Sequence, residues 1–361
     1  MVEWKKLGDV CEIQRGVRVI RKDLEGEGII PVFQNSLIPL GFYKMSNYPE
    51  NTPFVISAGA AGDIGFSTIP FWAADDCLCL SNFKGLISKY SYYYLLVKQS
   101  LLKSRVRKAS VPRLSRTEVE NINIPIPSLA VQARIVGILD TFSASIENLK
   151  QQIAERRKQY EHYRGQLLDI EGKEGVKMMT LGDVGEICMC KRVLKDQTSD
   201  KGEIPFFKIG TFGGKADAYI ARNLFEEYKN KFSYPKKGDI LISAAGTIGR
   251  SVVFDGEDAY FQDSNIVWIA NDETLVTNRY LYYYYQIADW KTDGGTIRRL
   301  YNYNLKNTQI PVPTLDEQSH IVSILDTFEA SIANLEAQLK EREKQYEYYR
   351  NKLLTFEKEE L

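Results

Sequence analysis

The sequence lacks the long hydrophobic runs that mark membrane proteins. Its longest uncharged run is the 16 residues 28–43, which two prolines interrupt. A membrane helix needs roughly 18 apolar residues, so this run is too short to form one. The first ten residues contain no apolar stretch followed by a small-residue cleavage site, the pattern of a secretory signal. We therefore expect a cytoplasmic protein without a membrane span.

Cysteine is scarce, with five residues in a chain of 361. An odd count in a chain of this length is not typical of a disulfide framework. Cys77 and Cys79, like Cys188 and Cys190, are spaced so that each pair faces one side of a strand. Four thiolates are one possible zinc site, but the usual C-x₂₋₄-C spacing is absent. Small apolar side chains in sheet cores are the favoured interpretation.

Catalytic motifs are also missing. No G-x-x-x-x-G-K-[ST] loop is present, and the glycines of residues 59–65 lack the G-x-G-x-x-G spacing that cradles a pyrophosphate. The chain has two histidines, His162 and His320, and both fall in helical patterns where they are unsuitable as a general base. The carboxylates show no metal-ligand spacing. We expect a protein that is not an enzyme and binds no cofactor or metal.

The chain is a tandem duplication. Residues 7–13 (LGDVCEI) recur at 181–187 (LGDVGEI), and residues 128–169 match 314–355 at 25 positions. Because the offset grows from 174 to 186, the second copy carries 12 extra residues between these two signals. Each half is thus a variable module followed by a constant one. The predicted boundaries are 1–127 and 178–313 for the modules, and 128–177 and 314–361 for the constant segments.

Each constant segment predicts one long helix with a heptad seam. The helix over 135–167 spans roughly 48 Å at ~1.5 Å per residue. We expect the two helices to pair antiparallel as a coiled coil. Arg156 and Arg342 fall in the seam, where they either fix its register, mark where the helices splay or lie at a loose end. The predicted seam residues are Ile135, Leu139, Phe142, Ile146, Leu149, Tyr160, Ile321, Leu325, Phe328, Ile332, Leu335 and Tyr346.

The variable modules show short β-type runs separated by glycine and proline. The expected fold class is α+β, with two globular domains separated by the two antiparallel helices and related by a pseudo-two-fold internal repeat. Tyrosines cluster before each long helix, at matching places in the two halves. Core packing is favoured over base stacking for this set, which comprises Tyr90, Tyr92, Tyr93, Tyr94, Tyr280, Tyr282, Tyr283, Tyr284 and Tyr285.

Positive charge is concentrated although 47 basic residues balance 47 acidic ones. No Asp or Glu occurs from Cys77 to Thr117, a stretch with nine Lys and Arg residues. Such a one-sign surface suits DNA phosphates; a solvated face is the alternative. The candidate DNA-binding residues are Lys103, Arg105, Arg107, Lys108, Ser110 and Arg113 in the first module and Lys191, Arg192, Lys215, Arg250, Arg298 and Arg299 in the second.

Three motifs carry a resemblance to a known family. They lie at 237–249, 260–265 and 294–300 in the second module, with counterparts at 57–65, 71–76 and 109–114 in the first. With the I-P-[IV]-P before each helix and the I-L-D-T-F within it, the chain resembles the specificity subunit of type I restriction-modification enzymes. The resemblance implies two target-recognition domains that read a bipartite double-stranded DNA target. It also implies two adenine-methyltransferase subunits, which hold S-adenosylmethionine, and a restriction subunit as partners.

Two other functions stay open on the residues alone. The first is a coiled-coil scaffold that binds other proteins without reading DNA, which zero net charge favours and the acid-free basic stretch opposes. The second is a nuclease, although the chain has no Pro-Asp dipeptide of the kind with which such metal sites often begin. A salt titration of duplex binding separates the scaffold from a DNA-reading protein.

Overall fold

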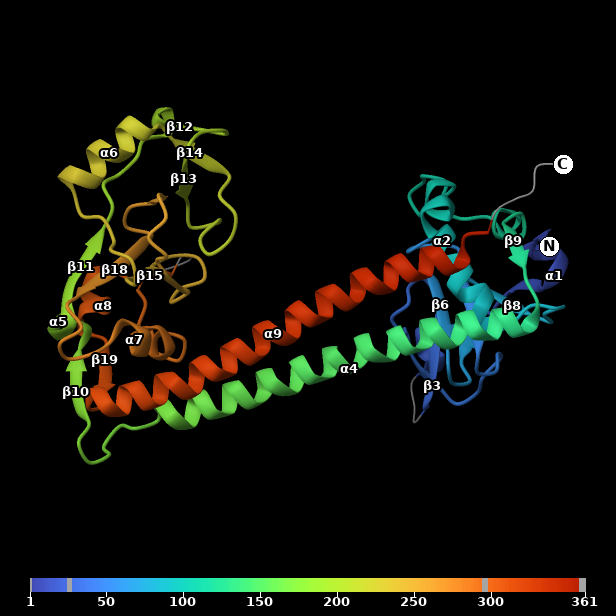
Figure 1. Ribbon diagram of the computed structural model, residues 1–361, viewed down its shortest axis with the longest axis horizontal. Helices are drawn as coiled ribbons and strands as arrows, with labels where there is room; N and C mark the ends of the chain where they lie inside the picture. The colour runs from blue at the N-terminus through green and yellow to red at the C-terminus, as the bar shows by residue number, and fades with distance from the viewer. Residues whose placement is uncertain (1, 25–27, 294–297, 357–361) are drawn as a thin grey trace. The chain divides into compact units, whose positions relative to one another are not determined.

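The computed structural model describes residues 2–24, 28–293 and 298–356. The chain divides into two compact units (Figure 1). Unit 1 comprises Met1–Gln151 with Glu336–Leu361, and unit 2 comprises Gln152–Leu335. Each unit therefore contains one of the predicted variable modules together with part of both long helices. The mixed helix and strand content confirms the predicted α+β class.

Unit 1 contains a four-stranded antiparallel sheet of order β2-β8-β5-β6, a three-stranded sheet β4-β3-β7 and a β1-β9 pair. Its strands are β1 (Glu3–Lys6), β2 (Glu12–Arg15), β3 (Ile30–Phe33), β4 (Gly41–Tyr43), β5 (Thr52–Ile56), β6 (Ile64–Ser67), β7 (Trp72–Ala73), β8 (Cys77–Ser81) and β9 (Asn123–Ile126). Its short helices are α1 (Leu7–Val10), α2 (Ser88–Ser104), α3 (Arg116–Glu120) and a 3₁₀ helix over Arg21–Leu24.

Unit 2 repeats this plan with the sheets β11-β18-β15-β16, β12-β14-β13-β17 and β10-β19. Its strands are β10 (Lys177–Thr180), β11 (Gly185–Met189), β12 (Thr198–Ser199), β13 (Ile204–Phe207), β14 (Ala218–Ile220), β15 (Ile240–Ser243), β16 (Ser251–Val253), β17 (Tyr260–Phe261), β18 (Ile266–Asn271) and β19 (Gln309–Val312). Its short helices are α5 (Leu181–Val184), α6 (Arg222–Lys231), α7 (Asn278–Tyr285), α8 (Asn302–Asn307) and a 3₁₀ helix over Lys195–Gln197. Strand β12 and helix α6 lie within the region where the sequence predicts extra residues.

Three of the five cysteines, Cys77, Cys79 and Cys188, lie in strands β8 and β11. Cys77 and Cys79 are fully buried in β8, and Cys190 is 2% exposed at the end of β11. Cys188 is half-buried. Within the described residues no group of three or more His, Cys, Asp or Glu side chains is placed to hold a metal. The arrangement agrees with the interpretation of these thiols as small apolar core residues.

The tyrosine clusters lie in α2 and α7 and contribute to the cores of the two units. Tyr90 and Tyr280 are fully buried and donate hydrogen bonds to the carbonyls of Pro125 and Pro311, at 3.1 and 2.8 Å. Burial raises the pKa of Tyr94 to about 12. Most members of the set have no free ring face, so core packing is their role.

The two long helices are α4 (Leu129–Leu168) and α9 (Leu315–Leu354), and they contact each other within both units. In unit 1 Phe142 stacks on Tyr349 at 5.4 Å between ring centroids, while Lys150 pairs with Glu343 at 3.6 Å. Higher numbers on α4 thus meet lower numbers on α9, so the helices are antiparallel as predicted. Both begin several residues before the predicted seam.

The two seam arginines make equivalent contacts. The guanidinium of Arg342 lies 5.7 Å from the ring of Phe142 in unit 1, and that of Arg156 lies 5.8 Å from the ring of Phe328 in unit 2. Each arginine thus covers the phenylalanine of the other helix. Of the interpretations that the sequence left open, this contact favours fixing the register.

The predicted seam residues lie in two environments. Ile135, Leu139, Ile321 and Leu325 are buried in the cores of the two units. The middle of each helix is more open, with Ile146, Leu149, Ile332 and Leu335 half-buried. The seam therefore serves the packing of each helix on its own unit as well as the helix pair.

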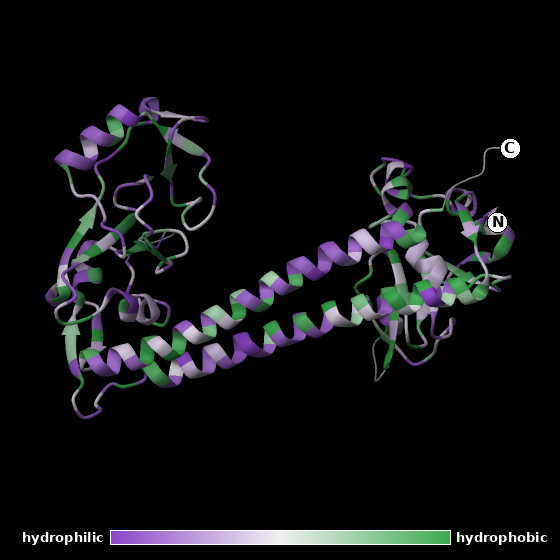
Figure 2. Cartoon of the chain, in the orientation of Figure 1, coloured by the Kyte–Doolittle hydropathy of each residue, from purple (hydrophilic) through white to green (hydrophobic). Residues whose placement is uncertain are grey.

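Helix α4 is long and apolar enough to cross a membrane by length and composition, with an 18-residue window of mean hydropathy 1.3. The expectation that the chain has no helix able to span a membrane was based on the length of uncharged runs. That criterion is too strict, because α4 contains an apolar stretch that is interrupted by isolated charged residues. Figure 2 shows the hydrophobic residues recurring along both long helices. A helix of a soluble helical pair passes the same criterion, and α9 packs against α4, so one such helix is weak evidence for a membrane span.

A buried glutamine fixes each long helix on its unit. The Gln318 amide accepts from Thr277 N at 2.8 Å and donates to the carbonyls of Leu275 and Pro313 at 3.0 Å. Gln132 makes the same three bonds in unit 1, with the backbone of Ile87, Gly85 and Pro127, at 2.8 to 3.0 Å. We call this the glutamine joint. In each unit its bonds satisfy one backbone N–H and two backbone carbonyls.

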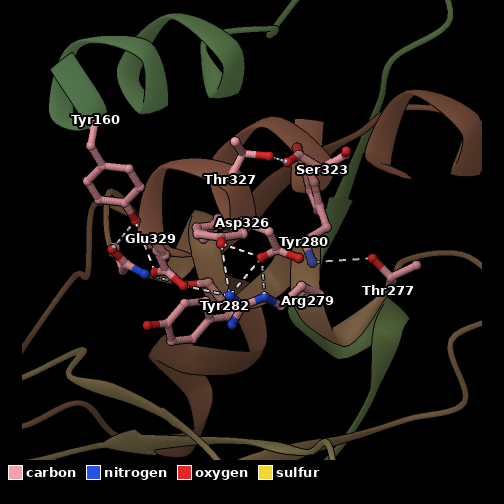
Figure 3. A network of polar contacts seen from close by, with 11 residues as sticks. Tyr160, Thr277, Arg279, Tyr280, Tyr282, Ser323, Asp326, Thr327 and Glu329 are labelled. Atoms are coloured by element: carbon pink, nitrogen blue, oxygen red, sulfur yellow. Dashed lines mark hydrogen bonds and ion pairs between the residues drawn. The ribbon is translucent and has the colours of Figure 1, made fainter. Parts of the chain in front are cut away.

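A second contact beside the glutamine joint differs between the units. In unit 2 Arg279 binds Asp326 at 2.7 Å and Glu329 at 2.6 Å (Figure 3). Tyr283 also donates a hydrogen bond to Asp326. Tyr160 of α4 reaches Glu329 at 3.4 Å (Figure 3).

In unit 1 Lys89 pairs with Asp140 at 2.9 Å and Tyr93 donates to the same carboxylate. The side chain that corresponds to Glu329 is Ser143, which lies 3.4 Å from the Tyr93 hydroxyl. Unit 2 therefore has one more carboxylate at this contact.

Candidate DNA interface

Two matching loops carry the arginines at the centre of the candidate interface. In unit 1 the loop 107–113 is closed by hydrogen bonds from Arg107 N to Arg113 O, 2.9 Å, and from Arg113 N to Arg107 O, 3.2 Å. In unit 2 Asp293 and Arg299 close the loop 293–299 in the same way, at 3.2 and 3.0 Å. We call these loops clasp 1 and clasp 2. Residues 294–297 of clasp 2 lie outside the described residues.

The end of clasp 1 is bound to the main sheet. Leu114 N donates to Ser57 O at 2.8 Å, and Ser57 N donates to Asp76 O at 2.7 Å. Gly59 N also donates to Pro112 O at 3.3 Å. The backbone of the clasp is thus held beside the segment that enters β8.

Clasp 2 has the same attachment. Leu300 N donates to Ala244 O, and Ala244 N donates to Asn265 O, both at 2.8 Å. Because the two bond patterns match, Asn265 in unit 2 occupies the place of Asp76 in unit 1. The clasps therefore share a backbone frame but face different side chains.

A glycine turn lies next to each clasp. Gly62 N donates to Ile56 O at 2.8 Å and Gly249 N to Ser243 O at 3.0 Å. Both glycines have positive φ, 89° and 79°, a region that side chains disfavour. The residue after each is Asp63 in unit 1 and Arg250 in unit 2, so charge reverses at one matched position. The Arg250 guanidinium donates to Phe212 O at 2.9 Å.

Three cations that have no carboxylate partner in the described part of the chain lie close together on clasp 1. Arg107, Lys108 and Arg113 are exposed, and no ion pair joins any of them to a carboxylate within the described residues. Ser110 is exposed at the tip of the loop. Lys103 and Arg105 differ, because they form ion pairs of 2.8 Å with Asp63 and Glu118. Clasp 1 is thus the part of the predicted basic stretch with the least compensated charge.

Two arginines near clasp 1 were not among the sequence candidates. Burial and the neighbouring Asp75 raise the pKa of Asp76, whereas the positive charges of Arg113, Arg15 and Arg18 act in the opposite direction. Arg15 ends β2 and Arg18 follows it. The sequence did not point to them, because they are far from clasp 1 along the chain. The pairing of β2 with β8 brings them close to Asp76.

In unit 2 Arg299 is held by neutral groups. Its Nη2 donates to Ser264 O at 2.8 Å, to Ser264 Oγ at 2.9 Å and to Asn265 Oδ1 at 3.1 Å. Ser264 has a left-handed backbone, with φ of 54°. The acceptors that hold the guanidinium carry no charge, so its positive charge is not neutralised there.

Arg299 borders a polar cleft of about 670 Å³ in unit 2. Arg192 lines the same cleft and pairs with Asp263 at 2.8 Å. Lys195 and Lys208 also line it, and neither was a sequence candidate. The fold thus brings together two predicted residues that are separated by more than 100 positions in the chain.

The remaining candidates of unit 2 are dispersed. Lys191 lies 5.1 Å above the ring of Phe232, outside the cleft lining. Lys215 and Arg298 are exposed. Tyr301 and Tyr303 are two stacked and exposed rings directly after clasp 2. The sequence did not single them out, because they lie outside the dense tyrosine clusters of α2 and α7.

Comparison with protein families agrees with this geometry. The family model described as type I restriction modification DNA specificity domain matches residues 1–156 and 173–344. A candidate type I restriction enzyme specificity subunit of Haemophilus influenzae, S.HindORF215P, is 46% identical over 98% of this chain and 96% of its own length. The specificity subunit of the Escherichia coli enzymes EcoR124I and EcoR124II is 29% identical over 99% of this chain and 95% of its own length.

Solved structures share the fold. The S subunit of a type I restriction-modification system from M. genitalium superposes with a TM-score of 0.67 at 16% identity, covering 99% of this chain and 97% of the other. A chain from a structure on assembly and conformational transition of the type I R-M system gives 0.59 at 18% identity, covering 98% and 96%. At these identities the likeness concerns the fold alone.

Proposed function

This chain belongs to the family of type I restriction-modification DNA specificity proteins, and we propose that it reads a bipartite double-stranded DNA target through its two modules. Its relatives are named as specificity subunits, and the chain is accordingly not an enzyme. In this proposal each module contacts one half-site, and partner subunits carry out methylation and cleavage.

The observation that carries the proposal is the repeated clasp. Two modules with divergent sequences keep the same closing bonds and the same attachment to the main sheet, and each ends in an arginine, Arg113 or Arg299. Loops on a rigid scaffold are where readout residues concentrate. Arginine is suited to both phosphates and base edges. A scaffold protein that does not read DNA has no need of a closed loop with an arginine at its end in both units.

The partners follow from the family and from the duplication. We propose that two adenine-methyltransferase subunits bind, one for each copy of the constant helix, together with a restriction subunit. S-adenosylmethionine is then held by the methyltransferase subunits. Light scattering of the co-expressed complex tests the stoichiometry: we expect two methyltransferase subunits per chain, and any other ratio contradicts this part.

Methylation mapping tests the DNA-reading function. In the source cell we expect a bipartite motif to be methylated when the chain is present and unmethylated when its gene is deleted. Exchanging residues 178–313 for the module of a relative should change one half of the motif and leave the other. Identical methylation with and without the chain would refute the proposal.

A further inference from the structure

The backbone at Arg299 is fixed before any ligand arrives. Two hydrogen bonds with Asp293 close clasp 2, and the next residue, Leu300, is bound to Ala244 of the sheet. Leu300 is also 3% exposed and packs in the core of unit 2. The Cα of Arg299 is therefore anchored on both sides, which limits the positions that its side chain can reach.

The guanidinium of Arg299 is oriented as well. Its Nη2 is engaged by the two oxygens of Ser264 and by the amide oxygen of Asn265. Its Nε and Nη1 have no hydrogen-bond partner in the part of the chain that the structure describes. The group borders the polar cleft, so donors remain for a ligand there. An arginine whose rotamer is already held loses less side-chain entropy on binding.

We propose that Arg299 reads a guanine in the half-site bound by unit 2, with Ser264 and Asn265 as its positioning residues. This inference rests on the proposed DNA-reading function. Guanine presents two acceptors, O6 and N7, on its major-groove edge, and arginine is their commonest partner. The neutral holders leave the positive charge of the guanidinium available to these acceptors.

Unit 1 supplies an internal contrast. At the matched position unit 1 has Asp76, a carboxylate that interacts electrostatically with Arg113 without forming an ion pair with it among the described residues. Asn265 lacks that charge, so Arg299 is oriented without being neutralised. Asn265→Asp converts the unit 2 position to the unit 1 type and should weaken the guanine preference.

The test uses the full chain purified with its methyltransferase partner and a pool of duplexes with randomised positions, sequenced after selection. For the wild type we expect a bipartite motif with a guanine in the half-site of unit 2. Arg299→Lys keeps the charge but loses the planar fork, so discrimination at that one position should fall about 5- to 150-fold. Asn265→Asp and Ser264→Ala should lower it less, in that order, with the other half-site unchanged.

The control is Arg222→Lys, since Arg222 is an exposed arginine of α6 paired with Asp258. It should leave the whole motif unchanged. A uniform loss of affinity in Arg299→Lys, without loss of the guanine, would identify a phosphate contact and overturn the inference. An unchanged motif in both Arg299→Lys and Asn265→Asp would also overturn it. If the wild type enriches no motif, the proposed function itself fails.

Discussion

The two clasps share a backbone and differ in the side chains around it. Both close with the same pair of bonds, and each is bonded to the residue that follows the matching strand of its main sheet, β5 in unit 1 and β15 in unit 2. Asp76 stands beside Arg113 in unit 1, whereas Asn265 holds Arg299 in unit 2. The comparison shows that a duplicated backbone frame keeps one arginine at the same place in both units while the charge of the residues around it differs.

The glutamine joint varies much less than the clasps. Gln132 and Gln318 are both fully buried and make the same three bonds. Replacing either buried glutamine removes the partner of three backbone groups, and water cannot take its place. The residues beside the clasps are partly exposed, so water can replace a lost contact there. The physical cost of unsatisfied buried groups explains why one part is constant and the other is not.

The largest effect that we predict concerns the glutamine joint. Gln318→Leu leaves one backbone N–H and two carbonyls without partners, at about 1–3 kcal/mol each, so the free energy of unfolding should fall by roughly 3 kcal/mol or more. Gln132→Leu should cost the same in unit 1. Denaturant unfolding measures both, with Gln166→Leu on the exposed face of α4 as control. A cost below about 1 kcal/mol in either would break the equivalence.

The next effect separates the clasps by charge. Replacing Arg107, Lys108 and Arg113 together by alanine removes three free cations, so the slope of log K against log salt should become shallower by about 2.7. Duplex affinity at low salt should fall about 100-fold. A triple replacement of Lys191, Lys215 and Arg298 in unit 2, which also removes three positive charges, should change the slope less, because these residues are dispersed. Equal slopes for both triples would contradict the assignment of free charge to clasp 1.

A smaller effect distinguishes the ion pairs beside the joints. Arg279→Ala removes contacts with two carboxylates and leaves Asp326 and Glu329 close together, and should destabilise unit 2 by about 1–2 kcal/mol. Lys89→Ala loses one partly exposed pair and should cost under about 1 kcal/mol. Unfolding at low and high salt measures the difference. A larger cost for Lys89→Ala would reverse the comparison.

The smallest effect is a pH dependence in unit 1. Burial and the neighbouring Asp75 raise the pKa of Asp76, so the folded state binds this proton more tightly than the unfolded chain does. The resulting stabilisation is present below the unfolded pKa of about 4 and is lost as pH rises through the folded pKa. Asp76→Asn should therefore stabilise unit 1 at pH 7 by a few tenths of a kcal/mol, after solvent screening.

Unfolding of Asp76→Asn and wild type at pH 4 and pH 7 checks this expectation. The gain should be larger at pH 7 than at pH 4. A gain at pH 4 alone would mean that the charged form of Asp76 is favoured in the folded state.

Much of the architecture was accessible from periodicity. The heptad spacing predicted both long helices, their antiparallel pairing and the seam arginines that cover Phe142 and Phe328. The similar segments 124–127 (IPIP) and 310–313 (IPVP), together with the tyrosine clusters, predicted matching positions in the two halves. These signals are local along the chain and repeat, and a single sequence is enough to read them. The exclusion of a membrane span was argued from uncharged runs alone and did not consider that α4 meets the criterion of length and composition.

The candidate interface was predictable only in part. Charge clustering singled out clasp 1, but it could not separate the free Arg107 and Arg113 from Arg105, which an ion pair occupies. It also missed Arg15 and Lys208. Partners of this kind come from distant segments, so sequence spacing carries no information about them.

The sequence by itself determined the duplication, the α+β class and the long paired helices, because hydrophobic periods of two and of three to four residues are written along the chain. Tertiary structure decided which cations are free and which arginine is held by neutral groups. Arg299 meets Ser264 and Asn265 only because β18 pairs with β15 and clasp 2 bonds to Ala244 at its end. Such contacts depend on strand register, and a shift of one residue would turn these side chains to the other face.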